Sequence, residues 1–303
     1  MSTIGFIGLG NMGFPMAGRL AEAGHELIVH DASTEAVEKF LTTHPTAAAA
    51  TAGWQNADVI ITMLPTSAIV EAVLLQDQVV AAASLNTLFI DMSSAEPTRS
   101  QQLGAVLEEK GMRYVDAPVS GGVRGAVNGQ LAIMAGGATA DVHEAMPLFK
   151  VMGKSTIHVG APGSGHAAKA LNNLVSAASV AVTVEALHIG ERFGIDPQTL
   201  TDVLNASSGR SNTSENKVAQ FMLSGTFASG FPIGLMTKDV NIALALAEEL
   251  GVAAELSHHC ADLWRQTVEK GFGPEDHTKM YAILDRTDHT RTHAPDSRTT
   301  LVD

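Results

Sequence analysis

Apolar and polar residues near the start of the chain follow two different periods. Residues 4–7 form an apolar run of strand length, and positions 16–21 then place apolar side chains on one face of a helix. Between them, residues 8–13 are GLGNMG, and a second apolar run at 26–30 is followed by Asp31. This pattern predicts a strand, a glycine turn, a helix and a second strand.

The same alternation continues through the first half of the chain. Apolar runs at 58–63 and 88–91 predict strands, and helical spacing at 34–41 and 69–75 predicts the helices that precede them. Strands and helices that alternate at this interval favour right-handed crossovers and a doubly wound parallel sheet. Further strands are expected from residue 114 and at 131–135 and 156–159, and a further helix near Glu96-Pro97.

The pattern changes after a glycine-rich joint at 160–165. Residues 166–193 contain no proline and no strand pattern, so they predict one helix that spans on the order of 40 Å. The remaining segments with helical spacing are 185–193, 197–205, 216–223, 240–250 and 256–270.

The glycine turn has the chemistry of a dinucleotide site. Gly8 permits a tight turn, Gly10 lets the backbone approach a pyrophosphate, and Gly13 lets the helix pack close to the strand. Backbone N–H groups at the helix N-terminus then receive the phosphates. A strand-to-helix turn without a ligand is the alternative. The predicted cofactor-binding residues of the turn are Gly8, Leu9, Gly10, Asn11, Met12 and Gly13.

An acidic residue follows the second predicted strand. Asp31 lies about 20 residues beyond the turn, where a carboxylate binds the ribose 2′-hydroxyl of NAD. Ala32 follows it, so a 2′-phosphate would meet a carboxylate and no adjacent arginine. NAD is therefore the predicted cofactor, in preference to NADP.

These observations predict an α/β Rossmann-type dinucleotide-binding domain followed by an all-α C-terminal domain, joined by a long helix. We place the NAD-binding domain at 1–162, the helical substrate and dimerisation domain at 163–288, and a polar tail at 289–303.

Three residues follow strands at the sheet edge where ligands bind. Leu64 and Pro65 come after the strand at 58–63, and Ser94 comes after the strand at 88–91. Ligands of doubly wound sheets lie beyond the carboxyl ends of the strands, so these residues are expected to line the cofactor. A strand stop at Pro65 and a helix cap at Ser94 are the alternatives.

The long helix begins with a candidate catalytic face. Lys169, Asn172 and Asn173 lie at i, i+3 and i+4 and share one side of the helix. A lysine shielded from water by a bound nicotinamide has a pKa below about 10.4 and can act as a general acid or base on a hydroxyl or carbonyl. Paired asparagines are poor helix formers, which favours a binding role. A solvated lysine beside asparagines that face a loop is the alternative.

Two further groups are candidates for anion contacts. Ser120, Gly121 and Gly122 follow the strand that begins at residue 114, and they are expected to form a nest for a carboxylate, with a simple turn as the alternative. Lys238 precedes the predicted helix at 240–250, where it is placed to reach a phosphate or the nicotinamide region while Asp239 caps the helix. An exposed lysine beside a cap is the alternative.

Composition narrows the class of protein. The 303 residues are 45% hydrophobic, enough for two domains with a core. Nineteen basic and 32 acidic residues give a net charge of −13, which argues against nucleic-acid binding. The single cysteine, Cys260, fits a reducing compartment and neither a disulfide nor a zinc site. The start lacks a signal-peptide pattern and the longest apolar stretch, 174–184, is too short to span a bilayer, so a cytoplasmic protein is expected.

Six motifs follow one another along nearly the whole chain. In this order they resemble the β-hydroxyacid dehydrogenase family, which includes 3-hydroxyisobutyrate dehydrogenase, tartronate semialdehyde reductase and L-threonate dehydrogenase. The resemblance implies a Rossmann domain, a long helix and a helical domain, in homodimers or homotetramers. The motifs are GFIGLGNMG at 5–13, MLP at 63–65, DMSS at 91–94, DAPVSGG at 116–122, GAPGSGHAAKALNN at 160–173 and MTKD at 236–239.

The resemblance also implies roles for single residues. Lys169 looks like the catalytic lysine and Asn173 its partner, while the turn at 120–122 matches the carboxylate-binding motif. Family members place a tryptophan near the substrate's side group, but this chain has GRSNTS at 209–214, which favours a hydroxylated or second anionic group over a simple methyl. The residues that would line the cofactor are Leu64, Pro65, Ser94 and Lys238.

The implied reaction is reversible hydride transfer between NAD and the C3 carbon of a small 3-hydroxy acid, as in 3-hydroxyisobutyrate dehydrogenase. Tartronate semialdehyde reductase or a threonate-type enzyme is the alternative for a polar substrate. A decarboxylating relative of 6-phosphogluconate dehydrogenase is a second alternative, although that chain is much longer. A silent NAD-binding module is the third, although it need not keep Lys169 and Asn173 together with the Ser120 turn.

Overall fold

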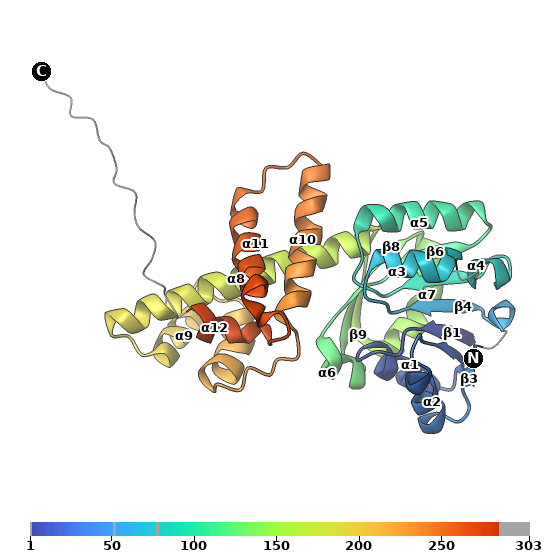
Figure 1. Cartoon of the computed structure of the whole chain (residues 1–303), viewed down its shortest axis with the longest axis horizontal. Coiled ribbons are helices and arrows are strands. Elements are labelled where there is room, and N and C mark those ends of the chain that lie inside the picture. Colours follow the sequence, from blue (N-terminus) through green and yellow to red (C-terminus); the bar gives the residue numbers. More distant parts are fainter. Residues whose placement is uncertain (1, 51–52, 77–78, 285–303) are drawn as a thin grey trace, which may run out of the picture. The chain divides into compact units, whose positions relative to one another are not determined.

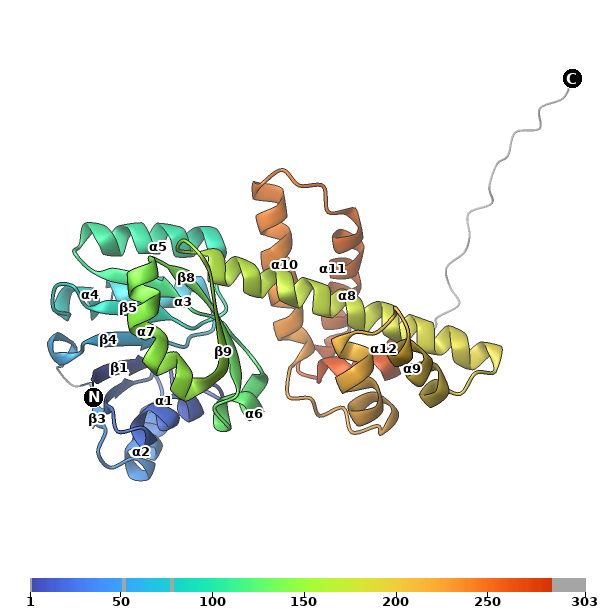
Figure 2. The ribbon, with the colours of Figure 1, turned by 180° about the vertical axis from the view of Figure 1, so that it is seen from behind.

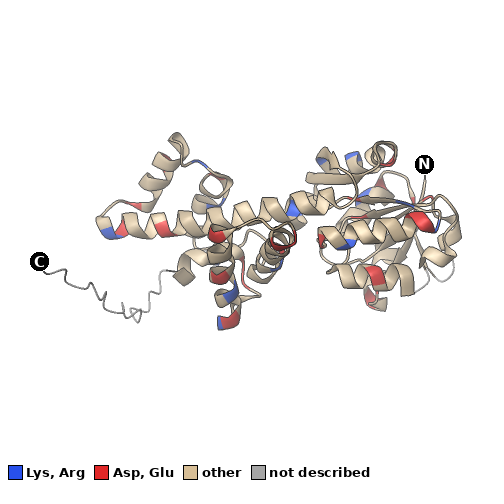
Figure 3. Ribbon diagram, turned by 90° about the horizontal axis from the view of Figure 1, so that it is seen from above, with Lys and Arg blue, Asp and Glu red and all other residues tan. Residues whose placement is uncertain are grey.

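The computed structural model describes residues 2–50, 53–76 and 79–284 of the chain (Figure 1). The polar tail expected at 289–303 lies outside the described residues. Lys and Arg residues are interspersed with Asp and Glu along the ribbon in the view of Figure 3.

Contacts between residues divide the chain into two units. The first combines Met1–Ala177 with Gly230–Glu275, and the second combines Ala178–Ser229 with Asp276–Asp303. The long helix α8, Ser164–Phe193, contributes residues to both units. The domain limits expected from the sequence remain a prediction.

The first unit is built on one sheet of short strands, of which the central ones are buried. Six of its strands are parallel, in the order β3-β2-β1-β4-β5-β6, which confirms the doubly wound pattern. Every residue of β4 and β5 is buried, because both faces of the sheet are covered. The bounds are β1 Thr3–Ile7, β2 Glu26–His30, β3 Ala48–Ala49, β4 Val59–Thr62, β5 Leu88–Asp91 and β6 Arg113–Asp116.

One edge of the sheet departs from the parallel pattern. Strand β8, Leu131–Gly137, runs antiparallel to β6 and to the short β7, Val119–Ser120. The connection from β6 to β8 contains β7 and the six-residue helix α6, Gly122–Val127. Strand β9, Gly153–Gly160, then pairs with β8 in parallel. The sheet is therefore mostly parallel.

Helices cover both faces of the sheet (Figures 1 and 2). Leu88 and Ile90 of β5 pack with α1, α2 and α7, whereas Phe89 between them packs with α3, η2, α4 and α5. This division follows from the two-residue period of a strand. The bounds are α1 Gly13–Glu22, α2 Thr34–Thr43, α3 Ser67–Glu71, η2 Ala72–Gln76, α4 Val79–Ala82, α5 Pro97–Glu109 and α7 Thr139–Met152.

The second half of the described chain is helical, as predicted. Helix α8 begins two residues before the expected start and continues to Phe193. By length and composition alone it could cross a membrane, contrary to the expectation from the apolar stretch, but 44% of its most apolar window is buried in the protein. The other bounds are η1 Trp54–Asn56, α9 Pro197–Ala206, η3 Ser214–Leu223, α10 Ile233–Glu249, α11 Glu255–Thr267, η4 Val268–Phe272, η5 His277–Lys279 and α12 Met280–Leu284.

Helix α10 begins seven residues earlier than expected. Ile233, Met236 and Val240 are all buried at helical spacing, so the apolar face starts at Ile233. Asp239 therefore lies inside the helix, and the prediction that it caps the helix is wrong. As a result Asp239 presents its carboxylate to neighbouring elements.

Candidate active site

The three glycines of the first turn meet different surroundings. Gly8 has a φ of +100°, and a Cβ there would lie 2.3 Å from the carbonyl oxygen of Met63. A Cβ on Gly13 would lie 1.8 Å from the carbonyl oxygen of Gly8, so only glycine lets α1 approach the turn this closely. At Gly10 a Cβ would meet nothing within 4 Å. Gly10 is thus the one fingerprint glycine that borders open space, as a pyrophosphate-facing position requires.

Asp31 is tied to the glycine turn. One of its carboxylate oxygens accepts the Leu9 N–H at 2.6 Å, and the other accepts the Ser33 N–H at 2.8 Å. The carboxylate thus fixes the turn and the loop after β2 together. An ionised carboxylate accepts more than one hydrogen bond per oxygen, so Asp31 retains acceptor capacity for a ribose hydroxyl.

The loops after β4 and β5 are joined to each other. The Ser93 hydroxyl accepts the Leu64 N–H at 2.9 Å, and the buried Asp91 carboxylate accepts the Ser93 N–H at 3.0 Å. The Lys238 ammonium donates to the carbonyl of Pro65 at 3.1 Å and to that of Ser94 at 2.9 Å. The structure therefore brings together the four residues expected along the cofactor crevice: Leu64, Pro65, Ser94 and Lys238.

Lys169 lies in a buried polar network. Asp239 accepts the Asn173 amide at 2.6 Å and the Ser94 hydroxyl at 2.8 Å, one on each carboxylate oxygen. Lys169 is 9% exposed, and among the described residues no hydrogen bond reaches its ammonium. Burial lowers the pKa of Lys169 below 10.5, the Asp239 charge acts in the opposite sense, and the Lys238 charge lowers it further. The amine thus has the environment of a general acid or base.

The predicted face of α8 divides in two. Asn173 is buried and belongs to the network, whereas Asn172 is exposed and donates to the Asn173 side-chain oxygen at 3.0 Å. The two asparagines are therefore linked, and Asn172 supports the oxygen of the amide whose nitrogen binds Asp239.

The turn expected to bind a carboxylate stands apart from this network. Ser120 ends β7, Gly121 has a φ of +132°, and Gly122 has a φ of +60° and begins α6. No hydrogen bond within the described part of the chain links these residues to Lys169, Asn173 or Asp239. Their role in substrate binding remains a prediction.

Polar groups of the loop at 209–214 form hydrogen bonds with each other. The Ser211 hydroxyl accepts the Ser214 N–H at 3.1 Å, and the Ser214 hydroxyl accepts the Ser211 N–H at 2.9 Å. Thr213 is buried and its hydroxyl accepts that of Ser179 at 3.0 Å. Arg210 and Asn212 are the exposed polar side chains that remain.

Sequence reasoning missed three contributors to the site. Asp239 was expected to cap a helix, and no role was expected for Asp116 or His166, which hold the start of α8. The available signals were an acidic residue at the buried end of a strand, Asp116, and a histidine one helical turn before Lys169. Neither signal predicts which residues Asp116 and His166 contact, because those residues lie far away in the sequence.

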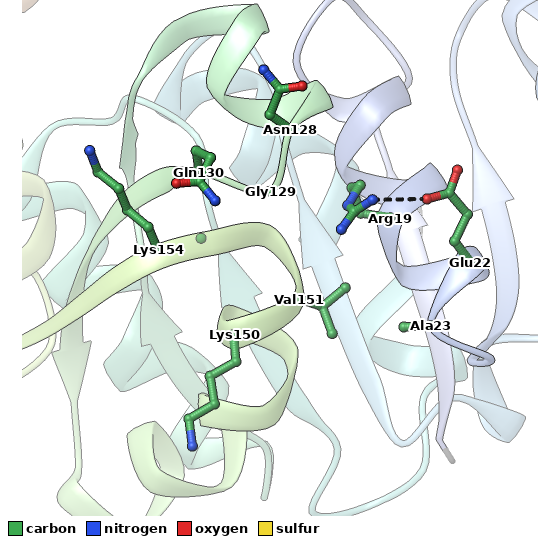
Figure 4. Close-up of a pocket in the computed structure, with 10 residues that line it drawn as sticks. Arg19, Glu22, Ala23, Asn128, Gly129, Gln130, Lys150, Val151 and Lys154 are labelled. Carbon is green, nitrogen blue, oxygen red and sulfur yellow. Dashed lines mark hydrogen bonds and ion pairs between the residues drawn. The ribbon is translucent and has the colours of Figure 1, made fainter.

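A separate concavity of about 580 Å³ lies on the first unit (Figure 4). It is lined by Arg19, Lys150 and Lys154 among others, and by none of the predicted site residues. The Arg19 guanidinium lies 3.1 Å from the Glu22 carboxylate. The side chains of Lys150 and Lys154 point away from Arg19 (Figure 4). Among the described residues no cluster of three or more His, Cys, Asp or Glu side chains could hold a metal ion.

Two family models match the chain in sequence. The NAD binding domain of 6-phosphogluconate dehydrogenase matches residues 3–160, and the NAD-binding domain of NADP-dependent 3-hydroxyisobutyrate dehydrogenase matches residues 163–284. The chain belongs to the 3-hydroxyisobutyrate dehydrogenase family. The resemblance to β-hydroxyacid dehydrogenases and the predicted fold class are therefore confirmed.

Several relatives align over almost the whole chain. The 2-(hydroxymethyl)glutarate dehydrogenase of Eubacterium barkeri is 36% identical over 93% of this chain and 95% of its own. The mitochondrial 3-hydroxyisobutyrate dehydrogenase of Bos taurus is 36% identical over 93% of this chain and 86% of its own. A solved Mycobacterium tuberculosis 3-hydroxyisobutyrate dehydrogenase with L-serine superposes with a TM-score of 0.88 at 34% identity, covering 95% of this chain and 100% of that one.

Proposed function

We propose that this protein catalyses reversible hydride transfer between NAD and the C3 carbon of a small 3-hydroxy acid. The observation that carries the proposal is the buried Lys169, whose pKa is lowered by burial, on the same helix as Asn173 and beside the Asp239 carboxylate. The lowered pKa makes the neutral amine available at a lower pH than in an ordinary lysine, and the neutral amine accepts the hydroxyl proton as the alcohol is oxidised and returns it during reduction.

The surrounding residues have distinct tasks. The dinucleotide lies over the glycine turn, and the nicotinamide supplies or accepts the hydride when bound. Asp239 orients the Asn173 amide and Ser94, and Lys238 fixes the two crevice loops from α10. The turn at 120–122 receives the substrate carboxylate through its N–H and hydroxyl groups.

The cofactor choice follows from Asp31. Its carboxylate is held at the glycine turn by the Leu9 N–H, where it accepts a ribose hydroxyl and repels a 2′-phosphate. NAD is therefore proposed as the cofactor and NADP as a poor substitute.

The substrate is proposed to carry a polar group besides its carboxylate. The motif GRSNTS at 209–214 stands where 3-hydroxyisobutyrate enzymes have a tryptophan, which the resemblance places near the substrate's side group. A hydroxylated or second anionic substituent on C2 suits such side chains better than a methyl group. The similar proteins include a 2-(hydroxymethyl)glutarate dehydrogenase and a 3-hydroxyisobutyrate dehydrogenase solved with L-serine.

We further propose a cytoplasmic homodimer or homotetramer assembled through α8. Val175, Val182, Ile189 and Phe193 are 69%, 60%, 71% and 84% exposed. Their spacings of seven, seven and four residues place them along one stripe of the helix. A row of large exposed apolar side chains on one helix favours a protein contact, and a second copy of the chain presents the matching row.

The test is a coupled set of assays on the purified protein. Absorbance of the reduced cofactor is followed with a panel of 3-hydroxy acids and semialdehydes, with NAD and NADP compared at equal concentration. We expect turnover with at least one 3-hydroxy acid and a preference for NAD. Release of CO₂ during turnover would favour the decarboxylating alternative, and binding of NADH without turnover of any panel member would favour the silent module.

A further inference from the structure

A buried polar cluster built on Asp116 and His166 lies under the start of α8. Asp116 ends β6 and is fully buried. One of its carboxylate oxygens accepts the Gly163 N–H at 2.7 Å, and the other accepts the His166 N–H at 2.7 Å. Asp116 thereby satisfies two N–H groups at the helix start from a neighbouring strand.

The His166 ring makes a second connection. It is 1% exposed, with Nδ1 2.7 Å from the Ser100 hydroxyl on α5 and Nε2 3.2 Å from the Ser93 carbonyl oxygen. A carbonyl oxygen only accepts, so Nε2–H donates to Ser93. The Ser100 hydroxyl that meets Nδ1 also donates to the Glu96 carbonyl oxygen at 3.1 Å, and the Asp116 carboxylate lies 3.6 Å from Nδ1. Both ring nitrogens are therefore used, and α8 is tied to α5 and to the loop after β5.

The loop after β5 also contacts the residues around Lys169. The Ser93 hydroxyl accepts the Leu64 N–H, and the next residue, Ser94, donates its hydroxyl to Asp239. His166 lies three residues before Lys169, about one helical turn away. One side chain thus links the helix that carries the amine to the loop that binds the amine's neighbour, Asp239.

We propose that His166 is a positioning residue, whose two ring hydrogen bonds set the distance of Lys169 from the β5 loop. This proposal rests on the proposed function of Lys169. His166 reaches neither cofactor nor substrate in this role. It acts on the rate because a displacement of about 1 Å at a catalytic group lowers turnover by up to ~100-fold. An apolar side chain of similar bulk would fill the same space but would not fix the position of α8 relative to the loop after β5.

Three variants separate positioning from packing. His166→Leu keeps a side chain of similar bulk and removes both ring hydrogen bonds. His166→Gln offers one donor and one acceptor at similar reach. Ser100→Ala removes the Nδ1 partner, together with the Ser100 hydrogen bond to the Glu96 carbonyl oxygen, and leaves the ring's bond to Ser93. Each is measured for kcat, KM of the acid, Kd of NADH and melting temperature. We expect His166→Leu to lower kcat ~10- to 100-fold with the Kd of NADH within about threefold, because the glycine turn and Asp31 are untouched.

The conservative variants give the decisive comparison. We expect His166→Gln to recover kcat to within about fivefold of the parent, and Ser100→Ala to lower kcat by less than His166→Leu. Should His166→Leu fail to fold, Ser100→Ala against the parent carries the test. Unchanged kcat in folded His166→Leu, or equal losses in the Leu and Gln variants at equal melting temperature, would overturn the proposal.

A second readout does not depend on turnover. Brief acetylation with acetic anhydride, followed by peptide mass spectrometry, measures the reactivity of Lys169 relative to the exposed Lys39. We expect the relative rate at Lys169 to rise severalfold in His166→Leu and to return toward the parent value in His166→Gln. If the parent proves inactive on every 3-hydroxy acid, the proposed function fails, but an unchanged acetylation ratio is still required to reject positioning by His166.

Discussion

At the scale of single residues, the site depends on how burial and charge are balanced around one amine. Lys169 is buried without a hydrogen bond from the described residues, and the Asp239 charge opposes the effect of burial on its pKa. Asp239 accepts from Asn173 and Ser94 and lies 3.7 Å from the Lys238 ammonium, and among the described residues no ion pair joins it to Lys169. The amine thus remains available to a substrate proton.

Replacement of Lys169 tests this role directly. We expect Lys169→Ala to lower kcat by about 10²- to 10⁴-fold, the usual contribution of a general acid or base, while the Kd of NADH changes little. Stopped-flow turnover and fluorescence titration with NADH measure the two quantities. Unchanged turnover would remove Lys169 from the mechanism.

The pH dependence of oxidation follows from the sign of each charge. The base must be neutral, so kcat/KM rises with pH through the pKa of Lys169, and this limb is expected at a midpoint below 10.5. Asp239→Asn removes a charge that favours the ammonium, so the pKa falls and the limb moves to lower pH. Lys238→Met removes a charge that disfavours it, so the limb moves to higher pH. Shifts of the opposite sign would exclude Lys169 as the titrating group.

Cofactor choice is also decided by one carboxylate. Asp31→Asn keeps an acceptor for the Leu9 N–H but removes the charge that repels a 2′-phosphate. We expect the ratio of kcat/KM with NAD to kcat/KM with NADP to fall by ~10-fold or more, at a melting temperature close to that of the parent. An unchanged ratio would show that another residue selects the cofactor.

At the scale of elements, the strand-turn-helix unit of β1 and α1 combines two kinds of glycine. Gly13 is required by the fold, because a Cβ there would overlap the carbonyl of Gly8, while Gly10 borders empty space. The same sequence motif therefore contains one residue selected by packing and one selected by a ligand. The sequence alone does not separate them, because both are simply glycine.

A matched pair of alanine variants separates the two. We expect Gly13→Ala to destabilise the protein by about 1–3 kcal/mol or more, as overpacking does in other proteins. Gly10→Ala should leave the melting temperature unchanged while the Kd of NADH rises ~10-fold or more, because the added methyl occupies the place of the pyrophosphate. Calorimetry and NADH fluorescence give both values. Normal NADH affinity in Gly10→Ala would place the phosphates elsewhere.

At the scale of the whole molecule, α8 connects the site to the proposed assembly. Its early residues carry the buried network, and its exposed positions from Val175 to Phe193 carry the apolar stripe. Burial on one side and the proposed contact on the other would account for the apolar window of this helix, which by length and composition alone could cross a membrane.

A charge placed on the stripe should break the assembly. We expect Val182→Glu to shift the protein to the monomer mass in light scattering coupled to gel filtration, because a buried unpaired carboxylate costs several kcal/mol. Val203→Glu on α9 is the matched control, since Val203 is 53% exposed and lies on another helix. A parent protein that is already monomeric, or equal behaviour of the two variants, would contradict the proposal.

The sequence by itself determined the local elements and the chemistry they suggest. Three signals each lie within about 30 residues of sequence: the strand and helix periods, the glycine that takes a positive φ at Gly8, and the acidic residue after β2. From these local signals the Rossmann unit, α8 and the positions of Asp31 and Lys169 could be predicted. The local pattern also gave one wrong prediction. Asp239 was expected to cap a helix at 240–250, but α10 begins at Ile233.

Only the tertiary structure decided which of these residues meet. Asp239 binds Asn173 across 66 residues of sequence and Ser94 across 145, and His166 reaches Ser93 across 73. Such partners are chosen by how strands and helices pack, which sequence spacing does not encode. The antiparallel edge of the sheet and the burial of Lys169 were settled in the same way, because burial is a property of everything that surrounds a side chain.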